Sequence, residues 1–317
     1  MRVVFFGTPE LAVPTLEAVM KCHELLAVVC RPDRPKKRSK RPVPPPVKKF
    51  ALEHGIHVQQ PTKLNDGEFE AWLRGLAPDI CCLVAYGRIL KQPILDVPEH
   101  GFLNMHPSLL PRHRGPSPIK TAIREGDEVT GVTIMRLDTG MDTGDILLQK
   151  RVPIADDDTA GSLSDRLARV GAGLMLKALE IIESGQAVFT PQDHQKATTT
   201  KGFEKADARI DWTTPARHIH NLVRATNPWP VAHCMFRGEV CRIHRTDLPE
   251  NDTAAGPPPA TPGTVVRVDD ADGIVVATGE GSLRIVEIQM PGKRAMPTRD
   301  FLKGTPVEPG ETFENLR

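Results

Sequence analysis

The chain has 317 residues, 39% hydrophobic and 26% charged, and this length fits two domains of ordinary size. Its 41 basic residues nearly balance its 40 acidic ones, which excludes a chain-wide surface for a polyanion, so nucleic-acid binding has to be local. No apolar run approaches the length of a membrane span, no secretory cleavage site follows the first residues, and the six cysteines form no Cys-x-x-Cys pair. We therefore expect a cytoplasmic protein with reduced thiols and no membrane partner.

Short apolar runs alternate with amphipathic stretches through the first half of the chain. The strand-like and helix-like runs lie in turn at residues 3–6, 11–20, 25–30, 47–52, 80–84, 102–105 and 119–123. This alternation is typical of β-α-β units, so we predict an α/β, Rossmann-like domain with a mainly parallel sheet. Residues 130–137 and 145–153 have no helix-length segment between them, which favours antiparallel pairing at that edge. A long helix is expected from Leu163, with Gly185 as its stop.

The first predicted turn carries Gly7-Thr8-Pro9-Glu10 between a strand and a helix. It is not a Gly-x-Gly-x-x-Gly sequence, so a dinucleotide site is disfavoured. A tight turn that seats the helix is the simpler interpretation.

Residues 31–49 carry nine basic side chains against one acidic side chain, Asp33, and five prolines follow Pro32. So many like charges and prolines cannot pack as core. Two interpretations stay open: a solvated surface loop, or a local basic loop that grips a phosphate backbone.

The second half begins after a polar stretch that includes the low-complexity run at 197–201. We predict a catalytic domain at residues 1–188, a linker at 189–206 and a smaller domain at 207–317. Thr213-Thr214-Pro215 offers a helix start. Short strand-like runs follow, which suggest a small β-barrel, and they lie at residues 232–236, 240–244, 264–268, 274–278 and 283–288.

Asn104 and His106 alternate at strand spacing, so both should project to one side at the carboxyl end of a strand, where open α/β sheets place their sites. With Asp142 they could polarise an acyl carbonyl, stabilise its oxyanion and move a proton. Asp138 and Asp145 are rival candidates for the catalytic carboxylate. Asp138 could instead cap a turn, and Asp145 could open the next strand. Metal binding is disfavoured because no second histidine stands at ligand spacing.

The residues around these three match a known pattern. The segment Phe102 to Arg112, with Gly115, Thr130-Gly131-Val132-Thr133 and Met141-Asp142-Thr143-Gly144-Asp145, resembles the signature of the 10-formyltetrahydrofolate-dependent formyltransferases. More distant motifs are similar to the branch of that superfamily that acts on methionyl-tRNA. They are Phe6-Gly7-Thr8-Pro9, Pro32-Asp33-Arg34-Pro35, Val84-Ala85-Tyr86-Gly87, Ala208-Arg209-Ile210-Asp211-Trp212, Asn227-Pro228-Trp229-Pro230 and Pro291-Gly292-Lys293.

The resemblance implies a formyl donor, 10-formyltetrahydrofolate, and an acceptor, the α-amino group of initiator methionyl-tRNA, for use in translation initiation. It implies a C-terminal barrel similar to oligonucleotide-binding folds that helps to hold the tRNA. We also expect a monomer and no metal. By the same resemblance Asn104, His106 and Asp142 activate the carbonyl. The residues implied to bind folate are Ser108, Leu109, Leu110, Pro111, Tyr86 and Gly87, and those implied to bind tRNA are Arg34, Lys37, Arg38, Lys40 and Arg41.

Two departures from the family pattern affect these expectations. The family usually carries Gly-Arg-Gly in the basic loop, and here Lys37-Arg38-Ser39 replaces it, with Arg38 aligned by position. His113 stands where tryptophan is usual, and a structural role is expected for it.

Two other functions remain open from the sequence. A formyltransferase for an amino sugar nucleotide would keep the three carbonyl-activating residues and have no need of the basic loop. An RNA-binding relative without catalysis would not need the three residues.

Overall fold

The chain folds into two compact units. The computed structural model describes residues 1–35, 42–64, 67–249, 260–269 and 273–316. The first unit comprises Met1–Pro118, Val129–Pro153 and Ser164–Lys201. The second comprises Ile119–Glu128, Ile154–Leu163 and Gly202–Arg317. Among the described residues, no helix combines the length and apolar character that a membrane span requires.

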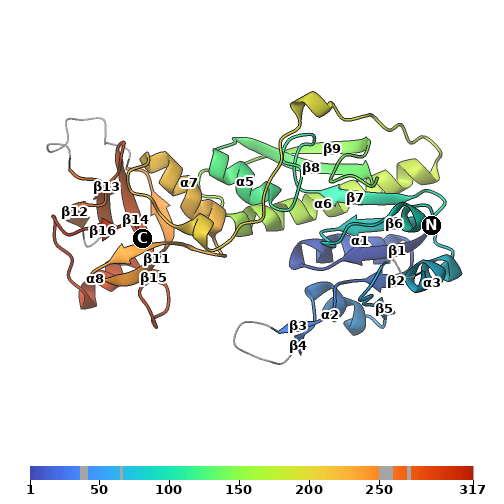
Figure 1. Cartoon of the computed structure of the whole chain (residues 1–317), viewed down its shortest axis with the longest axis horizontal. Coiled ribbons are helices and arrows are strands. Elements are labelled where there is room, and N and C mark those ends of the chain that lie inside the picture. The colour runs from blue at the N-terminus through green and yellow to red at the C-terminus, as the bar shows by residue number, and fades with distance from the viewer. Residues whose placement is uncertain (36–41, 65–66, 250–259, 270–272, 317) are drawn as a thin grey trace. The chain divides into compact units, whose positions relative to one another are not determined.

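The first unit is built on a mainly parallel sheet with the strand order β5-β2-β1-β6-β7-β8-β9 (Figure 1). In chain order the strands are β1 (Arg2–Gly7), β2 (Glu24–Val29), β5 (Val58–Gln59), β6 (Ile80–Val84), β7 (Phe102–His106), β8 (Val129–Arg136) and β9 (Ile146–Pro153). Pairing is parallel from β5 to β7 and antiparallel from β7 to β9. The predicted α/β class is confirmed, and so is antiparallel pairing at the β8–β9 edge.

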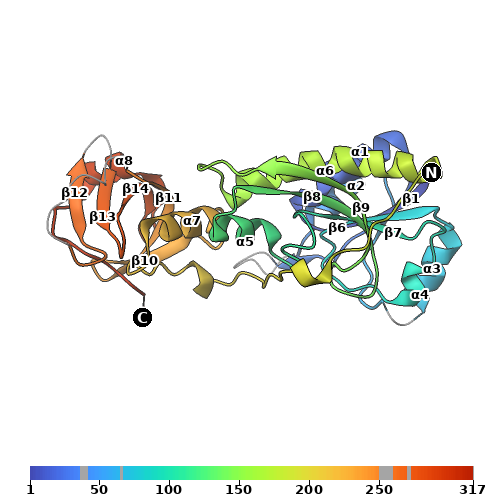
Figure 2. The same ribbon diagram turned by 90° about the horizontal axis from the view of Figure 1, so that it is seen from above.

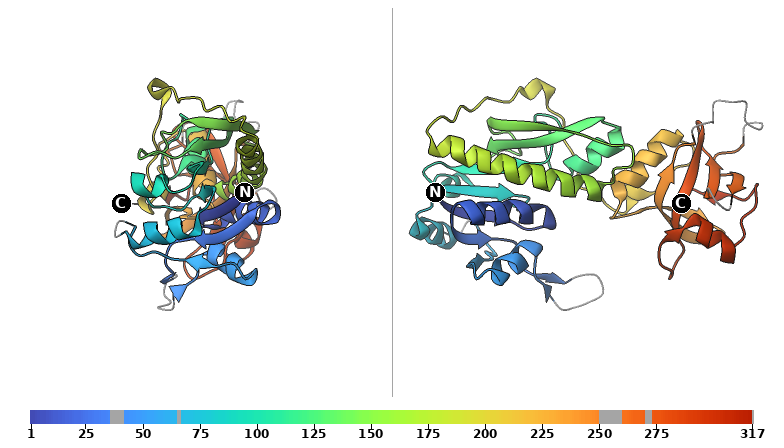
Figure 3. Two further views of the ribbon diagram at one scale, coloured as in Figure 1. Left: turned by 90° about the vertical axis from the view of Figure 1, so that its right-hand side faces the viewer. Right: turned by 180° about the vertical axis from the view of Figure 1, so that it is seen from behind.

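Helices cover both faces of this sheet. Helices α1 and α6 lie on one face and α3 and α4 on the other (Figure 2), and the long helix α6 is seen from the side in the right-hand view of Figure 3. The helical segments of the first unit are η1 (Glu10–Ala12), α1 (Val13–Cys22), α2 (Pro46–Glu53), α3 (Glu68–Leu76), α4 (Gln92–Leu95), most of α6 (Ala160–Glu183) and η2 (His194–Lys196), whereas α5 (Pro118–Glu125) belongs to the second unit from Ile119 on. Burial on both faces explains why β6 reads as an unbroken apolar run with every residue buried.

Aromatic rings fix the sheet on the face covered by α3 and α4. The Phe6 ring makes edge contacts with Phe69, Tyr86 and Phe102, with ring centroids 6.1, 5.5 and 5.1 Å apart. Each ring removes about 150–250 Å² of surface from water. This cluster therefore ties β1, β7 and the segment after β6 to α3, and it holds the carboxyl ends of neighbouring strands in place.

The second unit contains a curled antiparallel sheet with the order β12-β13-β14-β11-β10-β16. Its elements are η3 (Ala206–Ala208), α7 (Ala216–Thr226), β10 (Ala232–Phe236), β11 (Glu239–Asp247), β12 (Val265–Asp269), β13 (Gly273–Ala277), β14 (Ser282–Gln289), β15 (Met296–Pro297), α8 (Thr298–Gly304) and β16 (Phe313–Glu314). Alternate residues of β10 are buried, as one core-facing side requires. Trp212, Phe236 and Phe313 fill the core, so the expected barrel-like second domain is confirmed.

The segment expected to act as a linker, residues 189–206, is divided between the two units after Lys201. Its first part packs specifically: Thr190 bridges to Ile146, and Thr199 bridges to Arg114. These bridges are main-chain hydrogen bonds to the first unit, and the Thr198 and Thr200 hydroxyls also accept from the backbone N–H groups of His113 and Ser117. Gln192 and Thr200 are accordingly buried.

Candidate active site

Strand β7 delivers two polar side chains to the carboxyl edge of the sheet. Asn104 and His106 are each only 5% exposed, and the alternation of a strand directs both to the same side. β7 lies between parallel β6 and antiparallel β8, with Asn104 opposite Leu83 and Met135. Both side chains are therefore held by a central strand, in surroundings where a hydrogen bond is electrostatically stronger than in water.

The imidazole of His106 has a defined orientation. Its Nε2 lies 3.0 Å from the backbone oxygen of His113. Because a carbonyl oxygen only accepts hydrogen bonds, Nε2 carries a hydrogen and donates it. Nδ1 then faces the Asp142 carboxylate, with 3.6 Å between Nδ1 and Oδ2. Nε2 is thus engaged by the main chain, and Nδ1 is the ring nitrogen that faces Asp142.

Asp142 is presented by a turn that follows β8. Its backbone is left-handed, with φ of 54°, a conformation that aspartate tolerates better than most residues. The backbone N–H of Gly115 donates to Asp142 Oδ2 at 2.7 Å. The carboxylate is consequently fixed between a backbone donor and the imidazole.

The two rival aspartates have different surroundings. Asp138 accepts from the Thr143 hydroxyl at 2.7 Å and from the Gly140 N–H at 3.0 Å, so it caps the turn. Asp145 is exposed directly before β9, and its backbone oxygen accepts from Arg136. Of the three aspartates, the described structure pairs Asp142 with His106.

The segment 108–111 forms a rigid turn after β7. The Ser108 hydroxyl is fully buried and donates to the Arg112 backbone oxygen at 2.7 Å. Leu110 is held through both its backbone groups, by the Thr133 hydroxyl at 3.2 Å and by the Gln149 amide at 2.8 Å. The Ser108 hydroxyl is thus used inside the turn, whereas Leu109 and Pro111 are partly exposed.

The segment after β6 lies at the same edge of the sheet. The Tyr86 side chain is fully buried in the aromatic cluster, so a contact with a ligand from Tyr86 would have to come from its backbone. Ala85 and Gly87 on either side are exposed and left-handed, with φ of 47° and 77°. Thr8 donates to the Tyr86 oxygen and thereby joins the turns after β1 and β6.

The basic segment begins on a two-stranded ribbon that the sequence did not predict. β3 (Arg34–Pro35) pairs with β4 (Pro42–Val43), and Arg34 is exposed on it. The other predicted tRNA-binding residues, Lys37, Arg38, Lys40 and Arg41, lie outside the described residues.

Polar contacts anchor the base of this ribbon. Lys48 donates to Asp33 Oδ2 at 2.8 Å and to Gln60 at 2.8 Å, and Gln60 donates to Asp33 Oδ1. The hydrogen bonds from Lys48, and then from Gln60, hold the pKa of the Asp33 carboxyl below its usual range. Asp33, the single acidic residue of the basic segment, is therefore engaged in anchoring the ribbon.

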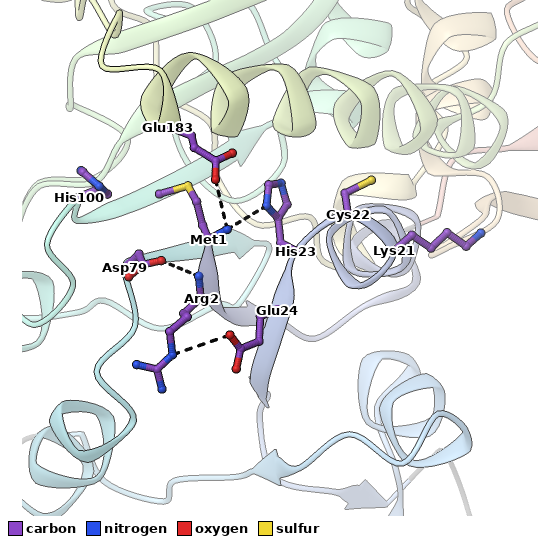
Figure 4. Close-up of a pocket in the computed structure, with 9 residues that line it drawn as sticks. All are labelled: Met1, Arg2, Lys21, Cys22, His23, Glu24, Asp79, His100 and Glu183. Atoms are coloured by element: carbon purple, nitrogen blue, oxygen red, sulfur yellow. Dashed lines mark hydrogen bonds and ion pairs between the residues drawn. The ribbon is translucent and has the colours of Figure 1, made fainter.

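A separate hollow of about 650 Å³ lies where the first strands begin (Figure 4). The Met1 ammonium approaches Glu183 and His23 at 3.5 Å, and the Arg2 backbone donates to Asp79. These polar groups engage one another, so the hollow anchors the start of β1. It lies at the opposite end of the parallel strands from Asn104 and His106.

The main-chain contributions to the site were not predicted from the sequence. The His113 carbonyl orients His106, and the Gly115 N–H holds Asp142. Gly115 has φ of 106°, and a side chain there would meet the Thr200 backbone oxygen. Only glycine suits that approach, and its presence in the motif was the one available signal.

Known proteins match both parts of the chain. The formyl transferase family model matches residues 1–179, and the model of the formyl transferase C-terminal domain matches residues 203–306. Methionyl-tRNA formyltransferases of Acetivibrio thermocellus and Agathobacter rectalis are 44% and 43% identical to this chain, each over 99% of both chains. An N-formyltransferase from Helicobacter canadensis, solved with folinic acid and dTDP-3-aminofucose, matches with a TM-score of 0.67 and 19% identity over 91% of this chain and 98% of that one.

The anchor at the base of the basic ribbon can be tested by titration. In a Lys48→Met variant we expect the pKa of Asp33 to rise toward about 3.9, the value of a free side chain. Because the pKa of Asp33 is lower in the folded protein than in the unfolded chain, its contacts stabilise the fold fully above about pH 3.9. This stabilisation is lost as pH falls through the pKa that Asp33 has in the folded protein. Carboxyl-carbon NMR measures the titration, with Lys49→Met as the control. An unchanged Asp33 titration in Lys48→Met would contradict the assignment.

Proposed function

This chain belongs to the formyl transferase family, and on that basis we propose that its active site transfers the formyl group of 10-formyltetrahydrofolate to the α-amino group of initiator methionyl-tRNA. The observation that carries the proposal is the end-to-end match to methionyl-tRNA formyltransferases, in a chain that holds His106 and Asp142 together. The product is N-formylmethionyl-tRNA, which serves translation initiation.

The choice of acceptor rests on identity along the whole chain. The methionyl-tRNA formyltransferases of Acetivibrio thermocellus and Agathobacter rectalis are 44% and 43% identical over both domains, whereas the likeness to the Helicobacter canadensis N-formyltransferase, at 19% identity, is one of fold. An amino sugar nucleotide acceptor is therefore not favoured. The intact pairing of His106 with Asp142 disfavours an RNA-binding relative without catalysis.

Formyl transfer proceeds through a tetrahedral intermediate. The neutral amine of methionine attacks the formyl carbon, a C–N bond forms, and the carbonyl oxygen gains negative charge. We assign the stabilisation of that oxygen to the Asn104 side-chain amide, a preorganised donor on a central strand. The bond from carbon to the folate nitrogen N10 then breaks and the carbonyl re-forms.

The reaction also moves one proton, from the attacking amine to the departing N10. His106 Nδ1 and Asp142 Oδ2 are the two groups at hand, since His106 Nε2 is committed to the His113 carbonyl. When Nδ1 is protonated, the neighbouring carboxylate stabilises the imidazolium. The pair can accordingly accept the proton and return it to N10.

The folate donor is assigned to the turns beside this pair. The partly exposed Leu109 and Pro111, with the backbone around Tyr86 and Gly87, offer apolar and main-chain contacts at the same sheet edge. Ser108 and Leu110 act by holding the turn through their own hydrogen bonds.

We assign tRNA binding to the basic loop, with Arg34, Lys37, Arg38, Lys40 and Arg41, and to the domain at residues 207–317. We propose residues 1–188 as the catalytic domain and 189–206 as the connection to the second domain, with residues 189–201 of that connection packed on the first unit. One chain supplies all three catalytic residues, so a monomer suffices for the chemistry. The cytoplasm, where tRNA is charged and used, is the compartment of the reaction, and six free cysteines suit it.

An acceptor comparison tests the proposed function. The full-length protein is incubated with a 10-formyltetrahydrofolate donor and either charged initiator tRNA or an amino sugar nucleotide, and formyl transfer is measured. We expect formylation of methionyl-tRNA alone. Formylation of the sugar nucleotide alone would overturn the choice of acceptor.

Asn104→Ala should lower kcat by about 10²–10³-fold, because it removes a donor used mainly in the transition state. The affinity for methionyl-tRNA should change little. Steady-state kinetics and direct tRNA binding measure the two quantities. A loss of tRNA affinity with unchanged kcat would contradict the assignment.

Asp142→Asn should lower kcat by about 10²-fold or more, because an amide cannot take part in proton transfer. Asp138→Asn is the matched control, since its amide oxygen still accepts from Thr143 and preserves the turn. Kinetics of the two variants should rank Asp142→Asn as the more damaged. The opposite ranking would show that the other carboxylate is catalytic.

The double variant Lys37→Ala, Arg38→Ala should bind methionyl-tRNA more weakly, with a salt dependence flatter by about one unit of slope per lost phosphate contact. The control Lys21→Ala, Lys177→Ala removes two exposed charges from helices α1 and α6, outside the basic segment. Methionyl-tRNA binding measured against salt concentration distinguishes the two double variants. Equal slopes in both variants would make the basic segment an ordinary solvated loop.

A further inference from the structure

Gln192 is a buried polar residue in contact with the turn that presents Asp142. It is 5% exposed and lies in the segment between α6 and η2. Its amide nitrogen donates to the backbone oxygen of Asp142 at 2.9 Å and to that of Gly144 at 2.7 Å. Both amide hydrogens are therefore used to hold two carbonyls of one short turn.

Arg114 fixes which way the Gln192 amide points. Its Nε and Nη2 donate to Gln192 Oε1 at 3.1 and 2.7 Å, and Nη2 also reaches His194 Nδ1 at 3.1 Å. A guanidinium has donors and no acceptor, so only the amide oxygen can face it. The Gln192 nitrogen is consequently directed at the turn and cannot exchange places with the oxygen.

Arg114 is itself well anchored. Its side chain is buried, its backbone N–H donates to Thr198 at 2.9 Å, and its carbonyl accepts from Thr200 at 2.7 Å. Gly115, the next residue, holds the Asp142 carboxylate. The segment Arg114–Gly115 thus holds Asp142 in two ways. The Gly115 N–H binds the Asp142 carboxylate, and Arg114 orients Gln192, which binds the Asp142 backbone oxygen.

We propose that Gln192, oriented by Arg114, is a positioning residue for formyl transfer: it fixes the turn from Met141 to Gly144 so that the Asp142 carboxylate stays opposite His106 Nδ1. The inference rests on the proposed function. Asp142 has a left-handed backbone and is only partly buried, so its turn depends on such contacts to keep one geometry. A displacement of about 1 Å at a catalytic group costs up to about 10²-fold in rate.

Gln192→Glu isolates this role. Glutamate keeps the length of the side chain and still accepts from Arg114, but its carboxylate has no hydrogen to donate and repels the two carbonyl oxygens. We expect kcat to fall by about 10- to 100-fold, with KM for methionyl-tRNA changed by less than about two-fold. Gln195→Glu is the matched control, an exposed glutamine three residues away, and it should behave as wild type.

A double-mutant cycle with Asp142 distinguishes positioning from general structural support. If Gln192 acts through Asp142, then Gln192→Glu should lower kcat by less than about two-fold in an Asp142→Asn background. An undiminished loss in that background would overturn the proposal, because it would show an effect that does not pass through Asp142. Unchanged kcat in the single variant would overturn it too.

Arg114→Lys provides a second route if Gln192→Glu fails to fold in thermal unfolding experiments. Lysine keeps the positive charge and loses the fork that orients the amide. The same fall in kcat and the same non-additivity with Asp142→Asn are expected, and additive losses would overturn the proposal. Wild-type protein that does not formylate methionyl-tRNA refutes the proposed function, whereas active wild type with an unaffected Gln192→Glu variant refutes this inference alone.

Discussion

The hydrogen bond from the Gly115 N–H to Asp142 Oδ2, 2.7 Å long, is the contact on which the site depends. It holds a carboxylate on a left-handed turn beside an imidazole on a rigid strand. Residues 113–115 supply that donor and also the His113 carbonyl that sets the His106 tautomer. Because Thr198 and Thr200 bind the same short segment, residues far along the chain determine the geometry at β7.

The sequence predicted the groups that come from regular structure. Alternation along a strand placed Asn104 and His106 on one side, and apolar periodicity predicted the parallel sheet and its antiparallel edge. The choice among Asp138, Asp142 and Asp145 stayed open, because the turn geometry that separates them has no periodic signal. Resemblance to the family, rather than spacing, favoured Asp142.

What the sequence could not predict is mostly main-chain and non-local. The Gly115 N–H that donates to Asp142 and the His113 carbonyl that accepts from His106 are backbone groups, which nearly every residue type carries. Gln192 lies in a polar stretch that composition assigns to a linker, and only the folded chain brings it to Asp142. Ser108 is the opposite case: the resemblance implied that it binds folate, but its hydroxyl donates within its own turn. The proposed chemistry is therefore read from a compact strand edge, whereas the proposed acceptor is read from sequence identity along the whole chain.

A crystal structure with an unreactive folate that carries a carbonyl at position 10 would show whether Asn104, His106 and Asp142 converge on the reacting group. We expect the carbonyl oxygen to lie about 2.7–3.1 Å from the Asn104 amide nitrogen. We also expect His106 Nδ1 and Asp142 to face N10, with His106 Nε2 still bonded to the His113 carbonyl. A folate carbonyl bound away from Asn104, or an imidazole turned so that Nε2 faces the ligand, would contradict this expectation.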